Sequence, residues 1–151
     1  MKTLASTEDL DAIRRRIQLL SPTDQRLWGS MSVHQMICHL TDAFRCPLGE
    51  RAVPPFKALP LPRPVFRYLA LYVPIKWPHG VPAPPEIRQP AGGAPPGEFN
   101  SDRDLLLAKL DSFVNAKELA PSHPMWGPLR RAEWMRWGYL HTDHHLRQFG
   151  R

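Results

Sequence analysis

Proline is crowded into one part of the chain, where residues 46–100 hold 14 of the 18 prolines. Such a composition is typical of linkers and of disordered segments. Large apolar and aromatic side chains are interleaved with these prolines, however, and a disordered linker rarely carries so many. We therefore expect a long insertion that wraps the body of the protein, with one short helix from about Pro64 to Val73. This insertion would form a lid or wall over a functional site, or would simply cover the core.

The rest of the chain has the apolar periodicity of α-helices rather than that of strands. The spacing Ser32-x-x-Gln35 predicts a capping box at the start of one helix, and Ser101-x-x-Asp104 resembles an imperfect one. These segments predict an all-α four-helix bundle in a single domain, residues 1–151, with the insertion between the second and third long helices. The long helices are expected over residues 6–20, from Ser30 or Ser32 to Cys46, from Asn100 or Ser101 to before Pro121, and from Leu129 or Arg131 to Phe149.

The composition of the chain limits its expected cellular location and binding partners. The two cysteines do not make a disulfide framework, and with no apolar leader at the N-terminus they predict a reducing, cytoplasmic location. No apolar run approaches the roughly 20 residues that a membrane span requires, so we expect no membrane partner. The net charge of +6 would suit an anionic partner, but the basic residues are scattered and no nucleic-acid motif accompanies them. We therefore do not expect nucleic-acid binding.

The last predicted helix carries a pair of histidines at a spacing that suits metal binding. His141 and His145 are four residues apart, so both rings fall on one helical face and can reach one ion. The same face carries Trp134, Trp137 and Gln148. This pattern predicts half of a metal site, beside indole rings that line a pocket or belong to the core.

A catalytic zinc takes three protein ligands, so the third must come from another element. His39 lies mid-helix among apolar residues, where an unpaired imidazole would be costly, and it is the preferred candidate. His34 does not share its helical face. His79 and His123 lie in loops flanked by proline.

Several alternatives remain open at this level. His144 is three residues from His141 and would serve in place of His145. Asp42 and Gln148 would orient a ligand or a bound water, or would make ordinary hydrogen bonds. Thr142 stands where a zincin protease has its glutamate, so that mechanism lacks a base. Cys38 is a weak candidate nucleophile, since it points about 100° away from its neighbour His39 on a helix.

Two segments together resemble the DinB/YfiT-like superfamily. Met31-Ser-Val-His-Gln-Met-Ile-Cys-His-Leu-Thr-Asp-Ala-Phe44 is similar to its second helix, and His141-x-x-x-His145-Leu-Arg-Gln148 is similar to its last. The fuller pattern also includes His123-Pro-Met-Trp-Gly-Pro-Leu129 and resembles an uncharacterised, domain-of-unknown-function branch.

The resemblance implies a four-helix bundle that holds nickel, zinc or a similar divalent ion on His39, His141 and His145. Members of the superfamily include thiol-dependent S-transferases and a maleylpyruvate isomerase, and many form homodimers. The expected function is therefore that of a metal-dependent enzyme on a small-molecule substrate, either a hydrolase or a transferase that uses a low-molecular-weight thiol. The alternative is a non-catalytic helical bundle that binds a small molecule or a partner in an apolar cavity.

Overall fold

A computed structural model describes residues 1–56 and 60–151, and these residues are mostly helical. They form five α-helices, one short 3-10 helix and one two-stranded antiparallel sheet. The elements in chain order are α1 (Thr7–Gln18), α2 (Val33–Arg45), α3 (Arg63–Tyr72), η1 (Pro85–Ile87), α4 (Phe99–Asn115), β1 (Ser122–His123), β2 (Gly127–Pro128) and α5 (Arg131–Gln148).

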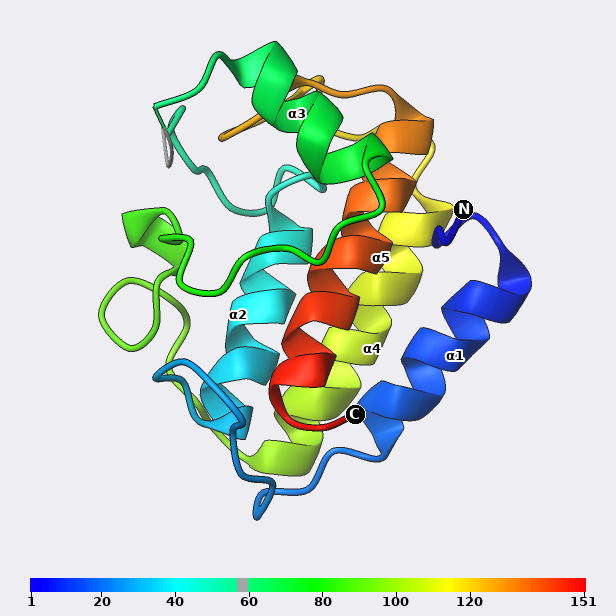
Figure 1. Ribbon diagram of the computed structural model, residues 1–151. Helices are drawn as coiled ribbons and strands as arrows, with labels where there is room; N and C mark the ends of the chain where they lie inside the picture. Colours follow the sequence, from blue (N-terminus) through cyan, green and yellow to red (C-terminus); the bar gives the residue numbers. More distant parts are fainter. Residues whose placement is uncertain (57–59) are drawn as a thin grey trace.

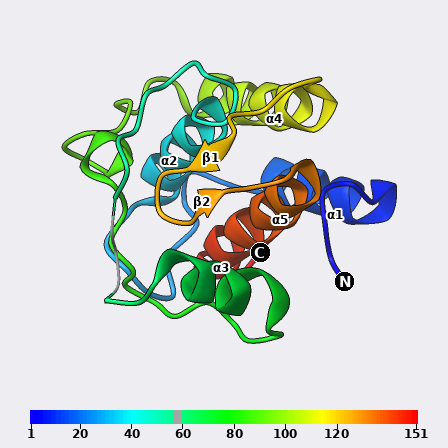
Figure 2. The same cartoon turned by 90° about the horizontal axis from the view of Figure 1, so that it is seen from above.

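The four longer helices lie side by side along the body of the molecule (Figure 1). Helix α2 packs on α4, α1 packs on both α4 and α5, and α2 meets α5. Seen from above, α3 lies outside this group against α5, and the small sheet covers the nearby ends of α2 and α5 (Figure 2). The apolar stripes of the helices therefore face one shared core, in which residues such as Phe44, Phe113 and Trp134 are fully buried.

The ends of the first two helices follow the local rules of capping. The Ser6 side chain accepts from the backbone N–H of Asp9, which confirms the predicted start of α1. At α2 the Ser32 hydroxyl accepts from the Gln35 backbone while the Gln35 side chain accepts from that of Ser32. The predicted capping box is thus confirmed in both directions.

The third long helix departs from the prediction at its start. Helix α4 begins at Phe99, and the carboxylate of Glu98 accepts from the backbone N–H of Ser101 at 2.8 Å. The predicted cap at Asn100 or Ser101 was therefore wrong, because a glutamate one turn earlier supplies the acceptor. The helix ends at Asn115, before Pro121 as predicted.

The connector before α5 contains a strand pair that the sequence did not predict. Ser122 pairs with Pro128 and His123 with Gly127, and the positive φ of 73° at Gly127 lets the chain fold back. Strands of two residues are too short to show an alternating pattern. The predicted absence of strands was therefore wrong here, although the chain remains mostly helical.

The proline-rich insertion contacts the body through α3, which packs on α5, and through η1, which packs on α2. Helix α3 occupies the predicted position, with Pro64 in its first turn. Residue Leu71 of this helix is fully buried, and the indole N–H of Trp77 donates to the Ala70 carbonyl. Within the described ranges, no helix combines the length and apolarity needed to cross a membrane.

Candidate metal centre

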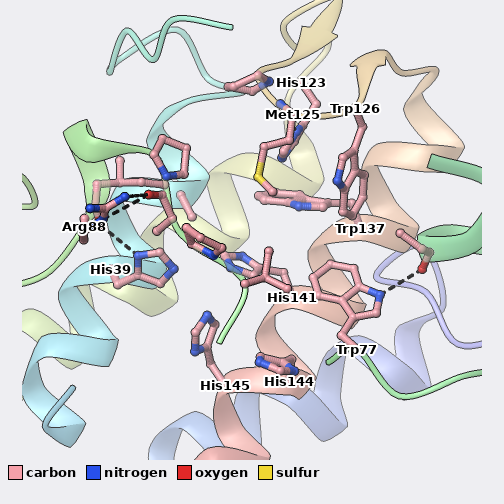
Figure 3. Close-up of a pocket in the computed structure, with 18 of the residues that line it drawn as sticks. His39, Trp77, Arg88, His123, Met125, Trp126, Trp137, His141, His144 and His145 are labelled. Atoms are coloured by element: carbon pink, nitrogen blue, oxygen red, sulfur yellow. Dashed lines mark hydrogen bonds between the residues drawn. The ribbon is translucent and has the colours of Figure 1, made fainter. Parts of the chain in front are cut away.

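Three imidazoles from two helices converge at one point inside the protein. His39 comes from α2, and His141 and His145 come from successive turns of α5 (Figure 3). Their ring centroids lie 4.8 to 5.3 Å apart. One ring nitrogen from each histidine lies within 4.8 Å of the other two, so the group could hold a metal ion. The alternative in which His144 replaces His145 does not form such a group.

Hydrogen bonds on the far side of the rings decide which nitrogens of His39 and His145 are free. His39 Nδ1 lies 2.9 Å from the carbonyl oxygen of Ile87, in η1. A carbonyl only accepts, so Nδ1 carries the hydrogen and Nε2 keeps its lone pair. His145 Nδ1 lies 3.1 Å from Gln148 Oε1, and the Gln148 amide nitrogen donates to the Trp28 carbonyl at 2.8 Å. The amide orientation is thereby fixed, and His145 also presents a bare Nε2.

His141 is held by stacking rather than by a hydrogen bond. Its ring lies nearly parallel to that of Trp137, with centroids 5.2 Å apart. Its Nδ1 is buried and finds no hydrogen-bond partner in the described parts of the chain. A buried polar nitrogen without a partner is costly, and this one lies in the cluster that a metal ion would complete. The donor set therefore fits a divalent ion of borderline softness such as zinc or nickel.

The electrostatics keep all three rings uncharged. Burial lowers the pKa of His39, and it lowers the pKa of His141 and His145 well below the usual value of 6.5. Repulsion from neighbouring imidazoles lowers the pKa of His141 and His145 further. Only the neutral imidazole has the lone pair that a metal ion needs, so the site is in its ligating form at neutral pH.

The cluster opens into a cavity of about 530 Å³. Its walls come from the proline-rich insertion, from the sheet region and from α5, with Trp77, Met125, Trp126 and Trp137 around its middle (Figure 3). Residues Trp134, Trp137 and Gln148 all line it, so the indole rings serve both the core and the cavity wall. Many of the residues that line the cavity lie between Leu61 and Arg88, which makes part of the insertion a wall of the site.

Comparison with known proteins identifies the family. A family described as "Protein of unknown function (DUF1569)" matches residues 2–151, which is nearly the whole chain. The chain belongs to this family. No curated protein and no solved structure matches it. What the DUF1569 chain does must therefore be argued from its own residues.

Asp42 of the DUF1569 chain lies one helical turn from His39 but does not bond to it. The Asp42 carboxylate is completely buried and accepts from Arg45, from Arg51 and from the backbone N–H of Ala94. Arg51 in turn donates to the carbonyls of Glu86 and Gly92. Asp42 thus holds the loop around η1, and that loop supplies the carbonyl that orients His39.

Two histidines outside the ligand group, His144 and His123, also lie near the site. His144 lines the cavity beside His145, and burial lowers its pKa to about 4. His123 stacks on Trp126 at 4.8 Å, lines the same cavity, and has its pKa lowered to about 3 by burial. The proline-flanked position of His123 suggested an ordinary loop. The signal that could have found it was its place in the longer motif of the family resemblance.

A second group of ligating side chains lies between α2 and α4. His34 Nε2 is 2.7 Å from Asp102 Oδ2, and the Cys38 thiol points at the same oxygen at 3.8 Å. The backbone N–H of Gly97 also donates to this oxygen, so the carboxylate is already well satisfied. Burial raises the pKa of Cys38 to about 12, which keeps it a thiol at neutral pH. This argues against the role of nucleophile for Cys38.

Proposed function

We propose that this member of the DUF1569 family is a metal-dependent enzyme that holds one divalent ion, zinc or nickel, on His39, His141 and His145. The observation that carries the proposal is the way in which two of these rings are oriented. In His39 and in His145 the Nδ1–H donates to a fixed acceptor, which leaves the Nε2 lone pair free in both. Histidines that only fill a core are not expected to direct unprotonated ring nitrogens towards one point.

The chain's own residues would bind, orient and shield. Three neutral imidazoles would leave open coordination positions on a divalent ion. The ion would act as a Lewis acid there, either lowering the pKa of a bound water to ~7 or holding a thiolate. The Ile87 carbonyl and the Gln148 amide keep two ligands in position. The buried indole of Trp137, stacked on His141, keeps bulk water from that side of the ring.

We further infer that the four longer helices form a four-helix bundle of the DinB/YfiT-like type, in a single domain over residues 1–151. The packing of α1, α2, α4 and α5 and the origin of the ligands on α2 and α5 support this relationship. A cytoplasmic location and a homodimer are parts of the same proposal. Sedimentation of the purified protein over a range of concentrations tests the homodimer.

A non-catalytic binding protein is the second candidate function. The large cavity with mostly apolar walls favours it, because such a space would hold a small molecule without any chemistry. In that case the histidines would be structural, and a chelator would change neither stability nor ligand affinity.

Metal content of protein purified without a polyhistidine tag separates the two functions. We expect close to one equivalent of zinc or nickel per chain in the wild type, and a loss of at least tenfold in metal affinity in His141→Ala. His79→Ala is the matched control, because His79 stacks on Trp28 outside the ligand group and should leave occupancy unchanged. Full occupancy in His141→Ala, or an empty wild type after incubation with both metals, would overturn the assignment.

A further inference from the structure

The charges around the cavity limit what it can bind. Among the described residues that line it, Arg88 is the only aspartate, glutamate, lysine or arginine. Arg88 is exposed, and its guanidinium donates twice to the Ala83 carbonyl, at 3.2 and 2.9 Å. Apart from a metal ion on the histidines, the interior thus offers no charged side chain to pair with a carboxylate, a phosphate or an ammonium group. A ligand that carried such groups inward would lose their hydration without compensation.

The walls offer broad apolar faces. The indole N–H of Trp77 is bonded to Ala70, and that of Trp134 is bonded to Ala120. Trp126 stands edge-on to Trp77, with centroids 5.3 Å apart, and Met125 lies beside them (Figure 3). Aromatic and thioether side chains of this kind favour flat, polarisable rings. A cavity of about 530 Å³ is in the range that holds a small organic molecule.

Two polar groups of the sheet region line the cavity away from the metal ligands: the His123 imidazole and the indole N–H of Trp126, which is buried without a partner among the described residues. His123 Nδ1 accepts from the backbone N–H of Met125 at 3.1 Å, so the ring hydrogen is on Nε2. This Nε2–H has no hydrogen-bond partner in residues 1–56 and 60–151. Trp137 separates His123 from His141, at 5.3 Å from the first ring and 5.2 Å from the second. A ligand that spans Trp137 would therefore meet a metal ion at one end and a neutral donor at the other.

We propose that the cavity takes an uncharged, ring-bearing molecule whose metal-binding oxygen or sulfur lies at the histidine cluster and whose hydrogen-bond acceptor lies at His123. The proposal rests on the metal site of the proposed function and adds the substrate class. It excludes polyanionic and zwitterionic thiols as occupants of the interior.

Calorimetric titration of the zinc-loaded protein with a series of hydroxamates tests the ligand class. Benzohydroxamate should bind at least tenfold more tightly than acetohydroxamate, because the ring is buried against the tryptophans. A carboxylate on the ring, as in 4-carboxybenzohydroxamate, should weaken binding at least tenfold. Equal affinity for the first pair, or tighter binding of the carboxylate, would overturn the proposal.

The acceptor at the far end is tested by adding a neutral acetyl group. Either 3- or 4-acetylbenzohydroxamate should gain about fivefold over benzohydroxamate in the wild type. This gain should disappear in His123→Phe, which keeps a flat ring against Trp126, and persist in the matched control His79→Phe. A gain that survives in His123→Phe would remove the role of that residue.

Metal-free protein distinguishes failure of this inference from failure of the metal site. Acetophenone should quench the tryptophan fluorescence of metal-free protein at lower concentration than benzoate does, since this preference depends only on the walls. If the protein binds no metal but shows this preference, the proposed function fails and the ligand class survives. If metal binds and the preference is absent, the ligand class is wrong.

Discussion

At the scale of a single residue, the Gln148 side-chain amide fixes the orientation and tautomer of the proposed metal ligand His145. Its oxygen accepts from His145 and its nitrogen donates to Trp28. The nitrogen also lies against Gly29, where a Cβ would come within 2.5 Å of it and where φ is +77°. The backbone at Gly29 is therefore shaped to let the amide stay in place.

Truncation of this amide should weaken the metal site without removing a ligand. In Gln148→Ala we expect metal affinity to fall about tenfold to hundredfold, because His145 loses the group that fixes its tautomer. Competition with a chromophoric chelator measures the change. Gln25→Ala, at an exposed glutamine outside the site, is the control and should leave affinity unchanged. An unaltered affinity in Gln148→Ala would mean that His145 needs no orienting partner.

How far the residues of the site could be predicted depended on whether the relevant partners were local. The i, i+4 pair His141 and His145 follows from helical geometry, and a buried His39 follows from its apolar neighbours. The carbonyl of Ile87 could not be predicted, because it lies 48 residues from His39 in a loop without periodicity. The hydrogen bond of Gln148 to Trp28 spans 120 residues and was equally beyond a local argument.

At the scale of elements, the start of α4 has the predicted kind of cap, but a different residue provides it. A cap was expected, and a cap is present, but its acceptor is the carboxylate of Glu98 rather than the hydroxyl of Ser101. Glutamate is not among the preferred capping residues, which is why the pattern favoured the serine. The backbone N–H that Glu98 binds belongs to Ser101 itself.

This assignment predicts opposite outcomes for two neighbouring substitutions. Glu98→Ala should lower the free energy of unfolding, and lower it more than Ser101→Ala does, since the helix loses its cap. Ser101→Ala should leave it within about 0.5 kcal/mol of the wild type, because only its backbone takes part. Urea denaturation of metal-free protein measures both. The reverse order of effects would restore Ser101 as the cap.

The loop that carries η1 is a second element held by a few strong contacts. Asp42 joins it through Ala94 and through Arg51, whose guanidinium binds the Glu86 and Gly92 carbonyls. Since Ile87 lies within this loop, its attachment to α2 also sets the orientation of His39.

Neutralising the buried carboxylate should therefore affect both stability and metal binding. Asp42→Asn should lower the free energy of unfolding by about 3 kcal/mol, because two arginines lose a buried partner, and should weaken metal affinity through His39. Asp143→Asn is the matched control, as Asp143 also lies between two arginines but is 22% exposed. We expect a loss of at most about 1 kcal/mol there, with unchanged metal affinity. Equal losses in the two variants would show that burial of Asp42 is unimportant.

At the scale of the whole molecule, the interior holds an unusual number of uncharged histidines. Burial lowers the pKa of His39, His123, His141 and His145, and also that of His144. Each of these groups takes up a proton more readily in the unfolded chain than in the folded one. The stability that these neutral rings contribute is therefore fully present above pH 6.5 and is lost as the pH falls towards the folded pKa values.

The pKa of His123 allows the pH dependence of the free energy of unfolding to be estimated for one residue. Its pKa is about 3 in the folded protein and near 6.5 when unfolded, so it should account for about 1.4 kcal/mol of lost stability per pH unit across that interval. Urea titrations of metal-free protein between pH 7 and pH 5 measure the slope. His123→Phe should reduce the mean slope over this range by about 1 kcal/mol per pH unit, because the unfolded imidazole is only partly protonated near pH 6.5. An unchanged slope would show that His123 is not buried as a neutral ring.

The central claim concerns the meeting of α2 and α5 at three imidazoles, and anomalous diffraction at the zinc and nickel absorption edges tests it most directly. A crystal of untagged protein incubated with each metal should show one anomalous peak, about 2.0–2.1 Å from one nitrogen of each of His39, His141 and His145. No peak at this point, or a peak only at His34, Cys38 and Asp102, would contradict the account.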